Sequence, residues 1–234
     1  MASTDTLELD LDPEDFKLRH PFRLIIAGPT QCGKSHLLFN ILDNLTECVN
    51  AKFQKIIFIY GVYQPIYDSY PNIHFTDDLD VLKTRPGVPT LLILDDVMNL
   101  IKDSTELETI FTRGRHEGFS IILLMQSLFY QGNVLKTIRN NTSYYAIFEH
   151  LQDTLRIANF AAQLEPKNSE YFKACYEDMR KTPYNYVFTD LHAESTLRGP
   201  PYFIKYRSRI HQYEGQILYL DKSQYKPDRK KFAS

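Results

Sequence analysis

The residues with the clearest chemical potential lie at positions 28–35, which read Gly-x-x-x-x-Gly-Lys-Ser. An apolar run, Leu24–Ala27, precedes this pattern, and apolar residues at helical spacing follow Lys34. A strand, a glycine-bracketed loop and a helix in this order predict a phosphate-binding loop. The glycines allow the backbone to approach phosphates closely, and the amides at a helix N-terminus attract anions.

Two side chains of this loop predict specific roles. Lys34 would place a full positive charge on the β- and γ-phosphates, and the Ser35 hydroxyl would ligate Mg²⁺. The alternative is a glycine-containing turn that binds nothing, and the flanking strand and helix argue against it. The predicted nucleotide-binding residues are Gly28, Pro29, Thr30, Gln31, Cys32, Gly33, Lys34 and Ser35.

A pair of carboxylates ends another apolar run, Leu91–Asp96. An acid at the carboxyl end of a buried strand is the usual partner of a phosphate loop, so Asp95 would hold Mg²⁺, directly or through water. Asp96 follows where a carboxylate that activates water is needed. A strand followed by an Asp-rich turn is the alternative, which the upstream phosphate loop makes the weaker interpretation.

A polar residue, Gln126, ends the apolar run Phe119–Met125. If this strand lies beside the first one, Gln126 faces the γ-phosphate and can sense it or orient the attacking water. A simple cap on the strand end is the alternative, and the sequence does not decide between them.

Apolar strands alternate with helical patterns, which predicts an α/β fold with a mostly parallel central sheet flanked by helices. The acidic strand is third in sequence, so another strand, the fourth, is expected to lie between it and the phosphate-loop strand. With the strands numbered along the chain, the expected order is 5-1-4-3-2. Two late strands, Tyr184–Phe188 and Tyr202–Tyr206, are expected to form an antiparallel hairpin at the sheet edge. The five strands are Leu24–Ala27, Lys55–Tyr60, Leu91–Asp96, Phe119–Met125 and Tyr144–Phe148.

The chain of 234 residues has a net charge of −2. The protein as a whole therefore lacks the excess positive charge that would indicate nucleic-acid binding. Three scattered cysteines exclude a disulfide framework, and no apolar run reaches membrane-spanning length. We expect a flexible acidic leader at 1–20, one nucleotide-binding domain at 21–220 and a basic polar tail at 221–234.

Several further stretches resemble the genome-packaging ATPases of the FtsK/HerA superfamily, a group of P-loop NTPases. The similarity is closest to the small members in Polinton-type elements, adintoviruses and virophages, with poxvirus packaging ATPases as distant relatives. The matching stretches run in family order and comprise residues 19–22, 28–35, 94–96, 111–116, 121–129 and 139–148.

The resemblance implies roles for individual residues. Lys34 and Ser35 match the phosphate and Mg²⁺ residues, Asp95 matches the acid on the metal side, and Gln126 matches the polar sensor. Asp96 matches a catalytic carboxylate that is Glu in many members, so its shorter side chain requires a shifted water. An arginine that acts on the γ-phosphate of a neighbouring subunit is also expected. The candidates are Arg113, Arg115 and Arg139. For Arg113 and Arg115 the alternative is a solvated basic turn or a DNA phosphate contact, while Arg139 immediately precedes a strand tip.

The function implied is an ATPase that uses ATP and Mg²⁺ to translocate double-stranded DNA into a viral capsid, independently of DNA sequence. The expected assembly is a homo-oligomeric ring, a hexamer, that contacts a capsid vertex or capsid protein and has no membrane span. The implied location is intracellular, in the host nucleus or cytoplasm, or with the virion.

Three other functions share part of this evidence. A nucleotide or nucleoside kinase shares the phosphate loop, although the third-position acidic strand argues against it. An ATP-dependent switch that partners a transposase or a helicase would hydrolyse ATP slowly, and a degenerate scaffold would not hydrolyse it. Basic residues interleaved with tyrosines from Arg198 onward could contact DNA or capsid, or could form a solvated edge hairpin and tail.

Overall fold

The apolar runs of the sequence form the strands of one mixed sheet. The computed structural model describes residues 17–83, 87–98, 104–114, 117–130, 132–150, 154–164, 169–192 and 203–206. The expected tail at 221–234, most of the expected leader and the basic residues from Arg198 onward, apart from Lys205, lie outside the described residues. Among the described residues, no helix has the length and apolar character needed to cross a bilayer.

The elements have the following bounds. The strands are β1 (Arg23–Ala27), β2 (Lys55–Tyr60), β3 (His74–Thr76), β4 (Thr90–Asp95), β5 (Phe119–Met125), β6 (Tyr144–Phe148), β7 (Tyr186–Asp190) and β8 (Phe203–Tyr206). The helices are α1 (Lys34–Asp43), α2 (Leu45–Cys48), α4 (Thr105–Arg113), α5 (Asn133–Asn140), α6 (Thr154–Leu164) and α7 (Ser169–Met179). Two 3₁₀ helices are η2 (Pro65–Ser69) and η3 (Leu79–Lys83).

The strand order is β3-β2-β4-β5-β1-β6-β7-β8. The predicted order 5-1-4-3-2 corresponds to β6-β1-β5-β4-β2 and is confirmed. The strands from β3 to β6 pair in parallel, while β7 pairs antiparallel with β6 and β8 with β7. The hairpin predicted at the sheet edge is therefore also confirmed.

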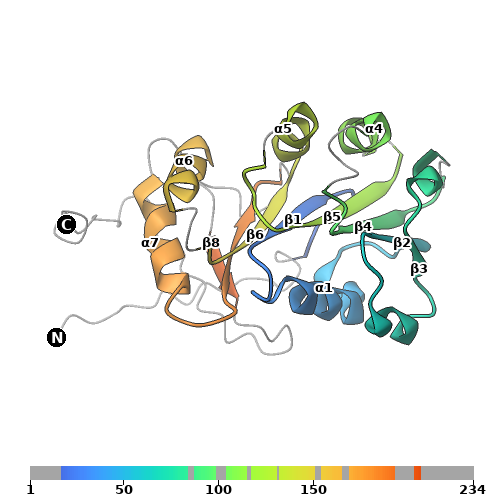
Figure 1. The fold of residues 1–234 in the computed structure, drawn as a ribbon, viewed down its shortest axis with the longest axis horizontal. Coiled ribbons are helices and arrows are strands. Elements are labelled where there is room, and N and C mark those ends of the chain that lie inside the picture. The colour runs from blue at the N-terminus through green and yellow to red at the C-terminus, as the bar shows by residue number, and fades with distance from the viewer. Residues whose placement is uncertain are drawn as a thin grey trace.

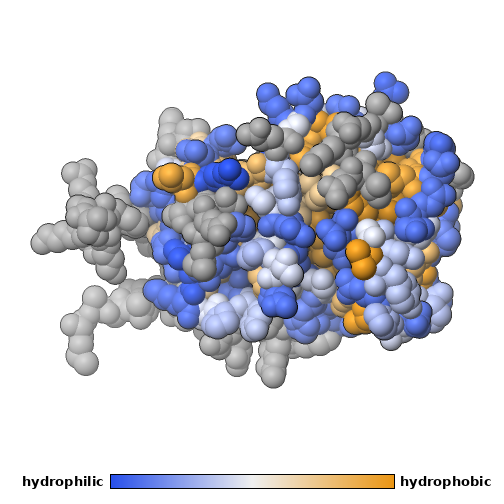
Figure 2. Space-filling model, viewed as in Figure 1, coloured by the Kyte–Doolittle hydropathy of each residue, from blue (hydrophilic) through white to orange (hydrophobic). Residues whose placement is uncertain are grey.

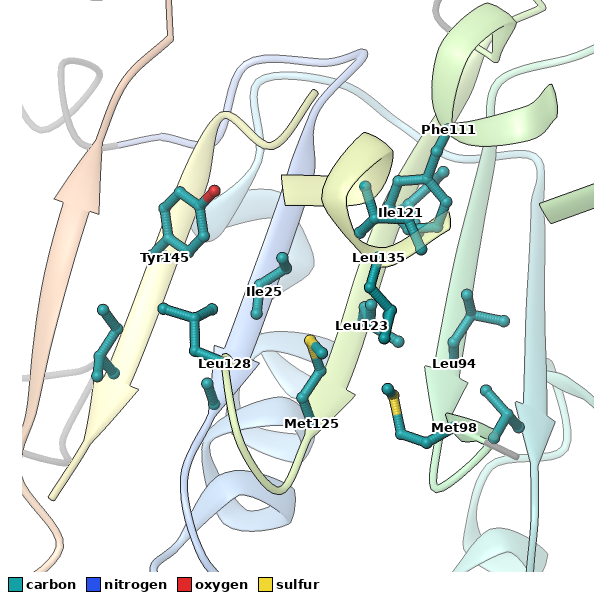
Figure 3. Packing of buried hydrophobic residues seen from close by; sticks show 14 of the residues in the cluster. Ile25, Leu94, Met98, Phe111, Ile121, Leu123, Met125, Leu128, Leu135 and Tyr145 are labelled. Atoms are coloured by element: carbon teal, nitrogen blue, oxygen red, sulfur yellow. The ribbon is translucent and has the colours of Figure 1, made fainter. Parts of the chain in front are cut away.

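Helices cover both faces of the sheet (Figure 1). Helix α1 packs on one face through Leu37, Leu38 and Ile41, while α4, α5, α6 and α7 pack on the other. Side chains alternate along each strand, so a strand between two helical layers is apolar at every position. Figure 3 shows the side that faces α4 and α5, where Ile25, Leu123 and Met125 point toward the helices.

Two predicted boundaries need correction. Strand β7 begins at Tyr186 rather than Tyr184, because Tyr184 has φ 62° and lies in a turn closed by the Asn185 amide, which donates to the carbonyl of Thr182 (3.4 Å). Part of the expected leader also belongs to the domain, because Leu18 is buried and forms a parallel bridge with Val49.

Candidate active site

The predicted phosphate loop connects β1 to α1 at the carboxyl edge of the parallel strands. Its start is fixed by the Gly28 amide, which donates to the carbonyl of Met125 at the end of β5 (3.1 Å). A β-carbon on Gly28 would lie 2.6 Å from the β-carbon of Phe148, so the position has no room for a side chain. Gly33 has φ 107°, a conformation that favours glycine, and it caps the helix.

The first turn of α1 is arranged to receive an anion. Gly33 supplies no side-chain cap, and no acidic residue lies in this turn. The first amides of a helix have no partner within it, and they carry the positive end of the helix dipole. Phosphate oxygens would therefore find both donors and a favourable field at this end of the helix.

The side chain of Lys34 lies inside the loop. Its ammonium donates to the carbonyl oxygens of Gly28 (2.7 Å) and Pro29 (2.6 Å), with the Cys32 sulfur at 4.0 Å. Burial raises the pKa of the Cys32 thiol, and the opposing effect of the Lys34 charge is smaller. Cys32 is therefore a small, protonated filler of the loop rather than an activated nucleophile.

The carboxylate of Asp95 lies within electrostatic reach of the Lys34 ammonium. Burial, together with the negative charge of Asp96, raises the pKa of Asp95 to about 6, and the Lys34 charge opposes both effects. Strand β5 separates β4 from β1, so the two residues approach each other across the end of one intervening strand. The sequence predicted this convergence of the loop lysine and the acidic strand.

Asp96 lies just beyond β4 in a left-handed conformation, with φ 54° and an exposed side chain. The segment after β2 supports this turn. The Gly61 amide donates to the carbonyl of Asp95 (2.9 Å), and a β-carbon on Gly61 would lie 2.2 Å from the carbonyl oxygen of Asp96. Sequence reasoning missed Gly61, although a glycine directly after a strand that neighbours the acidic strand is a usable signal.

Gln126 lies where the sequence predicted. Ala27 pairs with Met125 in the β1–β5 ladder, so Gln126 comes level with Gly28 at the carboxyl edge. Its side chain is exposed, between the phosphate loop and the end of the acidic strand β4. Its role as sensor or water-orienting residue stays a prediction.

The candidate Arg113 lies away from the phosphate loop of its own chain. Arg113 is exposed and ends α4, next to Gly114, whose carbonyl accepts from the amide of Phe119 at the start of β5 (2.9 Å). Arg113 therefore lies at the amino edge of the sheet, opposite the loop. Arg115 lies outside the described residues.

Arg139 is partly buried in the last turn of α5. Its guanidinium donates to the carbonyl oxygens of Leu128 (3.2 Å) and Tyr130 (3.0 Å), which belong to the segment that follows Gln126. The Tyr145 hydroxyl donates to the carbonyl of Arg139 itself (2.8 Å). These contacts hold the connection between β5 and α5 in place.

An aromatic cluster beside the acid pair was not predicted. Tyr67 of η2 is 3% exposed and stacks on Phe75 at 4.6 Å, next to Tyr60, which pairs with Asp95 in the β2–β4 ladder. Burial raises the pKa of Tyr67, and the charges of Asp95 and Asp96 raise it further. The Tyr67 hydroxyl is buried and has no hydrogen-bond partner among the described residues.

The connection from β2 to η2 also carries apolar side chains on its outer surface. Val62, Tyr63 and Ile66 are exposed, immediately after the glycine that contacts Asp96. Figure 2 shows that apolar residues reach the surface on the side of the molecule that holds β2 and β3. This segment therefore joins an exposed apolar surface to the backbone of the acid pair.

These residues lie together at the carboxyl edge of the sheet and have the chemical character that a phosphorylated ligand would require. The loop amides and Lys34 offer positive charge, while Asp95 and the Ser35 hydroxyl offer the oxygen ligands that Mg²⁺ prefers. Asp96 is exposed and lies next to Asp95, where it could accept a proton from water. The arrangement suits hydrolysis or transfer of a terminal phosphate.

Comparisons with known proteins bear on the sequence and the fold of the chain. No protein-family model matches the chain. Over 132 residues it is 29% identical to the DNA packaging protein OPG160 of variola virus and to that of vaccinia virus, covering 47% of this chain and 47% of each relative. The chain thus spans about half the length of the curated relatives it matches.

Among solved structures, the genome packaging NTPase B204 of Sulfolobus turreted icosahedral virus 2, in complex with sulfate, aligns with a TM-score of 0.52 and 14% identity. The alignment covers 73% of this chain and 91% of that chain. At this identity the likeness concerns the fold, and it confirms the predicted α/β architecture. The chain is thus similar to viral packaging proteins in sequence and in fold, as its motifs predicted.

Proposed function

We propose that this protein is a Mg²⁺-dependent ATPase that drives double-stranded DNA into a viral capsid. The observation that carries the ATPase part is the convergence of Lys34 and Asp95 at one edge of the sheet, within electrostatic reach of each other. The DNA part rests on similarity to the packaging proteins of poxviruses and to a packaging NTPase fold.

Each part of the site has one task in this reaction. The loop amides and Lys34 bind the phosphates of ATP, and Gln126 faces the terminal phosphate. Mg²⁺, held by Ser35 and Asp95, would neutralise charge on the β- and γ-phosphates. Asp96 accepts a proton from the attacking water, and Gly61 holds the backbone of Asp96 in the required turn.

A ring of identical subunits completes the site. In one chain Arg113 lies at the sheet edge opposite the phosphate loop, so it can reach a γ-phosphate only in a neighbouring subunit. We expect a hexamer in which Arg113 serves this role, with DNA phosphates contacted by loops that face the pore. Such contacts are independent of sequence and weaken with salt. The capsid vertex is the expected docking partner, and the location follows as intracellular or virion-associated.

Steady-state turnover of ATP tests the site. Lys34→Ala and Asp96→Ala should each lose most turnover, and wild-type turnover should rise with double-stranded DNA at low salt. Lys52→Ala, which changes an exposed lysine before β2, is the matched control and should behave as wild type. Undiminished turnover in Lys34→Ala would exclude the proposed site.

Two further measurements separate the alternatives. A kinase would transfer phosphate to a nucleoside monophosphate, and the presence of β5 between β1 and β4 argues against this class. A switch ATPase would hydrolyse ATP slowly and form no lasting ring. Mass measurement with ATP and DNA present should give a closed ring for the motor.

A further inference from the structure

A second feature adjoins the phosphate loop on the side away from the acid pair. An open cavity of about 270 Å³ lies between α1 and the strands β6 and β7. Its walls are mainly apolar, and Gly33 connects it to the loop. The other lining residues are His36, Leu37, Asn40, Phe148, Tyr184 and Tyr186. This volume lies just below the usual range for small-molecule sites, about 300–1,000 Å³, and suits one flat ring system.

The strand order places this cavity opposite the acid pair. Strand β1 lies between β5 and β6, with β4 beyond β5 and β7 beyond β6. A triphosphate bound by the loop therefore has Asp95 on one side and the cavity on the other. With its terminal phosphate toward Asp95, the remaining part of a nucleotide extends toward Phe148 and Tyr186.

The backbone of Tyr184 has an unfavourable conformation, and burial of its side chain does not compensate for the cost. It has φ 62°, a region that tyrosine adopts at a cost, and its side chain is 65% exposed. The Asn185 amide donates to the carbonyl of Thr182 (3.4 Å) and closes the turn that contains Tyr184. A β-carbon on Gly33 would lie 3.7 Å from the Tyr184 ring. Retained strain at a ligand-sized cavity points to a role for this ring in binding.

We propose that this cavity binds the purine base of the nucleoside triphosphate, with the Tyr184 ring stacked on the base. This proposal rests on the nucleotide-binding function proposed above. Aromatic rings bind bases through their faces, and a purine offers a larger face than a pyrimidine. Asn40 presents both a donor and an acceptor, which can pair with the edge of an adenine.

Calorimetric binding of ATP, CTP and inorganic tripolyphosphate to this chain tests the proposal. Tyr184→Ala should weaken ATP binding by about 5- to 150-fold, the equivalent of a stacking energy of about 1–3 kcal/mol. Its affinity for tripolyphosphate, which has no base, should equal that of wild type. Tyr184→Phe keeps the ring and should bind ATP as wild type does. Wild type should prefer ATP to CTP, and Tyr184→Ala should reduce this preference.

Tyr184→Gly separates binding from folding. Glycine removes the backbone strain at positive φ, so the melting temperature should rise while ATP affinity falls. If the Tyr184 side chain instead stabilised the fold, Tyr184→Gly would have a lower melting temperature than wild type. If Tyr184→Ala weakens ATP and tripolyphosphate equally, or weakens neither, the base pocket is wrong although the phosphate site stands. If wild type binds neither ligand, the proposed function fails and the base pocket fails with it.

Discussion

Gly61 and Asp96 are in direct backbone contact at the carboxyl edge of the sheet. A β-carbon at position 61 would lie 2.2 Å from the carbonyl oxygen of Asp96, and Asp96 itself has φ 54°. The neighbouring hydrogen bond from the Gly61 amide to Asp95 ties the same two segments together. The position of the proposed catalytic carboxylate therefore depends on a residue that has no side chain.

Gly61→Ala should reduce turnover by at least tenfold, because the backbone of Asp96 must shift to admit the methyl group. We also expect a loss of about 1–3 kcal/mol in unfolding free energy from overpacking. Gly87→Ala is the control: it has φ 62° and no atom within 4 Å of its β-carbon position, so it adds strain without a clash. Turnover assays and urea unfolding of both variants measure the two effects. Equal turnover in Gly61→Ala and wild type would contradict the proposed role of this contact.

The stability of the protein should depend on the charge of Asp95. Its pKa in the folded protein, about 6, lies above its ordinary value of 3.8, so the folded state holds the proton more tightly than the unfolded state. The charged form costs stability above pH 6, and this cost disappears as the pH falls toward 4. In EDTA, Asp95→Asn should therefore raise the unfolding free energy at pH 8 by about 2–3 kcal/mol at most, because a rise in pKa from 3.8 to about 6 costs the charged form this much.

The control for this prediction is Asp77→Asn, which changes an exposed carboxylate. Urea unfolding from pH 4 to pH 8 should show a smaller pH dependence in Asp95→Asn than in wild type, and no such change in Asp77→Asn. The opposite result would refute the assignment: an unfolding free energy that rises from pH 4 to pH 8 in wild type, with a smaller rise in Asp95→Asn.

Removal of the Tyr67 hydroxyl should not destabilise the protein. The hydroxyl is buried without a partner among the described residues, and such a group carries a desolvation cost. We expect Tyr67→Phe to be neutral or to stabilise by about 1 kcal/mol. Tyr70→Phe is the comparison, because the Tyr70 hydroxyl donates to Asp43 (2.9 Å) and its removal should cost a small amount. A clear loss in Tyr67→Phe, measured by urea unfolding, would reveal a partner for the hydroxyl.

Arg113 should act across a subunit boundary. Arg113→Ala should lower turnover by about 10³- to 10⁵-fold, as expected for an arginine that stabilises the transferring phosphate. Mixing Arg113→Ala with Lys34→Ala should restore part of the turnover, because some interfaces then combine an intact loop with an intact arginine. Arg156→Ala, another exposed arginine, should be close to wild type. Failure of the mixture to regain turnover would place the arginine elsewhere.

Arg139 should behave differently from Arg113. Its guanidinium already binds two carbonyl oxygens, so Arg139→Ala leaves both unpaired and should cost about 1–3 kcal/mol of stability. Turnover should fall because the segment after Gln126 loses its support. Mixing with Lys34→Ala should give no recovery, which distinguishes a positioning residue from a trans-acting one. If the mixture of Arg139→Ala and Lys34→Ala regained turnover, and Arg139→Ala were as stable as wild type, Arg139 rather than Arg113 would be the trans-acting arginine.

The sheet was predictable because its buried strands are continuous apolar runs. Phe119–Met125 and Tyr144–Phe148 have the bounds that the sequence predicted, since a strand covered on both faces is apolar at every position. The strand order followed from placing the acidic strand third in the chain. The loop at 28–35 and the acids at 95–96 were found because phosphate chemistry restricts both residue type and spacing.

The residues that sequence reasoning missed act through contacts between distant segments. Gly61 is significant only because β2 lies beside β4, and Tyr67 only because η2 folds back over the acid pair. Tyr184 was assigned to a strand because its type favours one, while the turn at 182–185 sets its actual φ. The edge that Arg113 occupies could have been predicted, because a loop directly before a strand of a parallel sheet lies at the amino edge.

The close approach of Gly61 to Asp96 has a mechanical consequence. Tightly packed backbone cannot absorb displacement, so movement of the β2–η2 connection must pass directly into the acid pair. Val62, Tyr63 and Ile66 present that connection to the outside. A partner that displaced these three side chains would therefore also shift the backbone of Asp96, the proposed catalytic carboxylate.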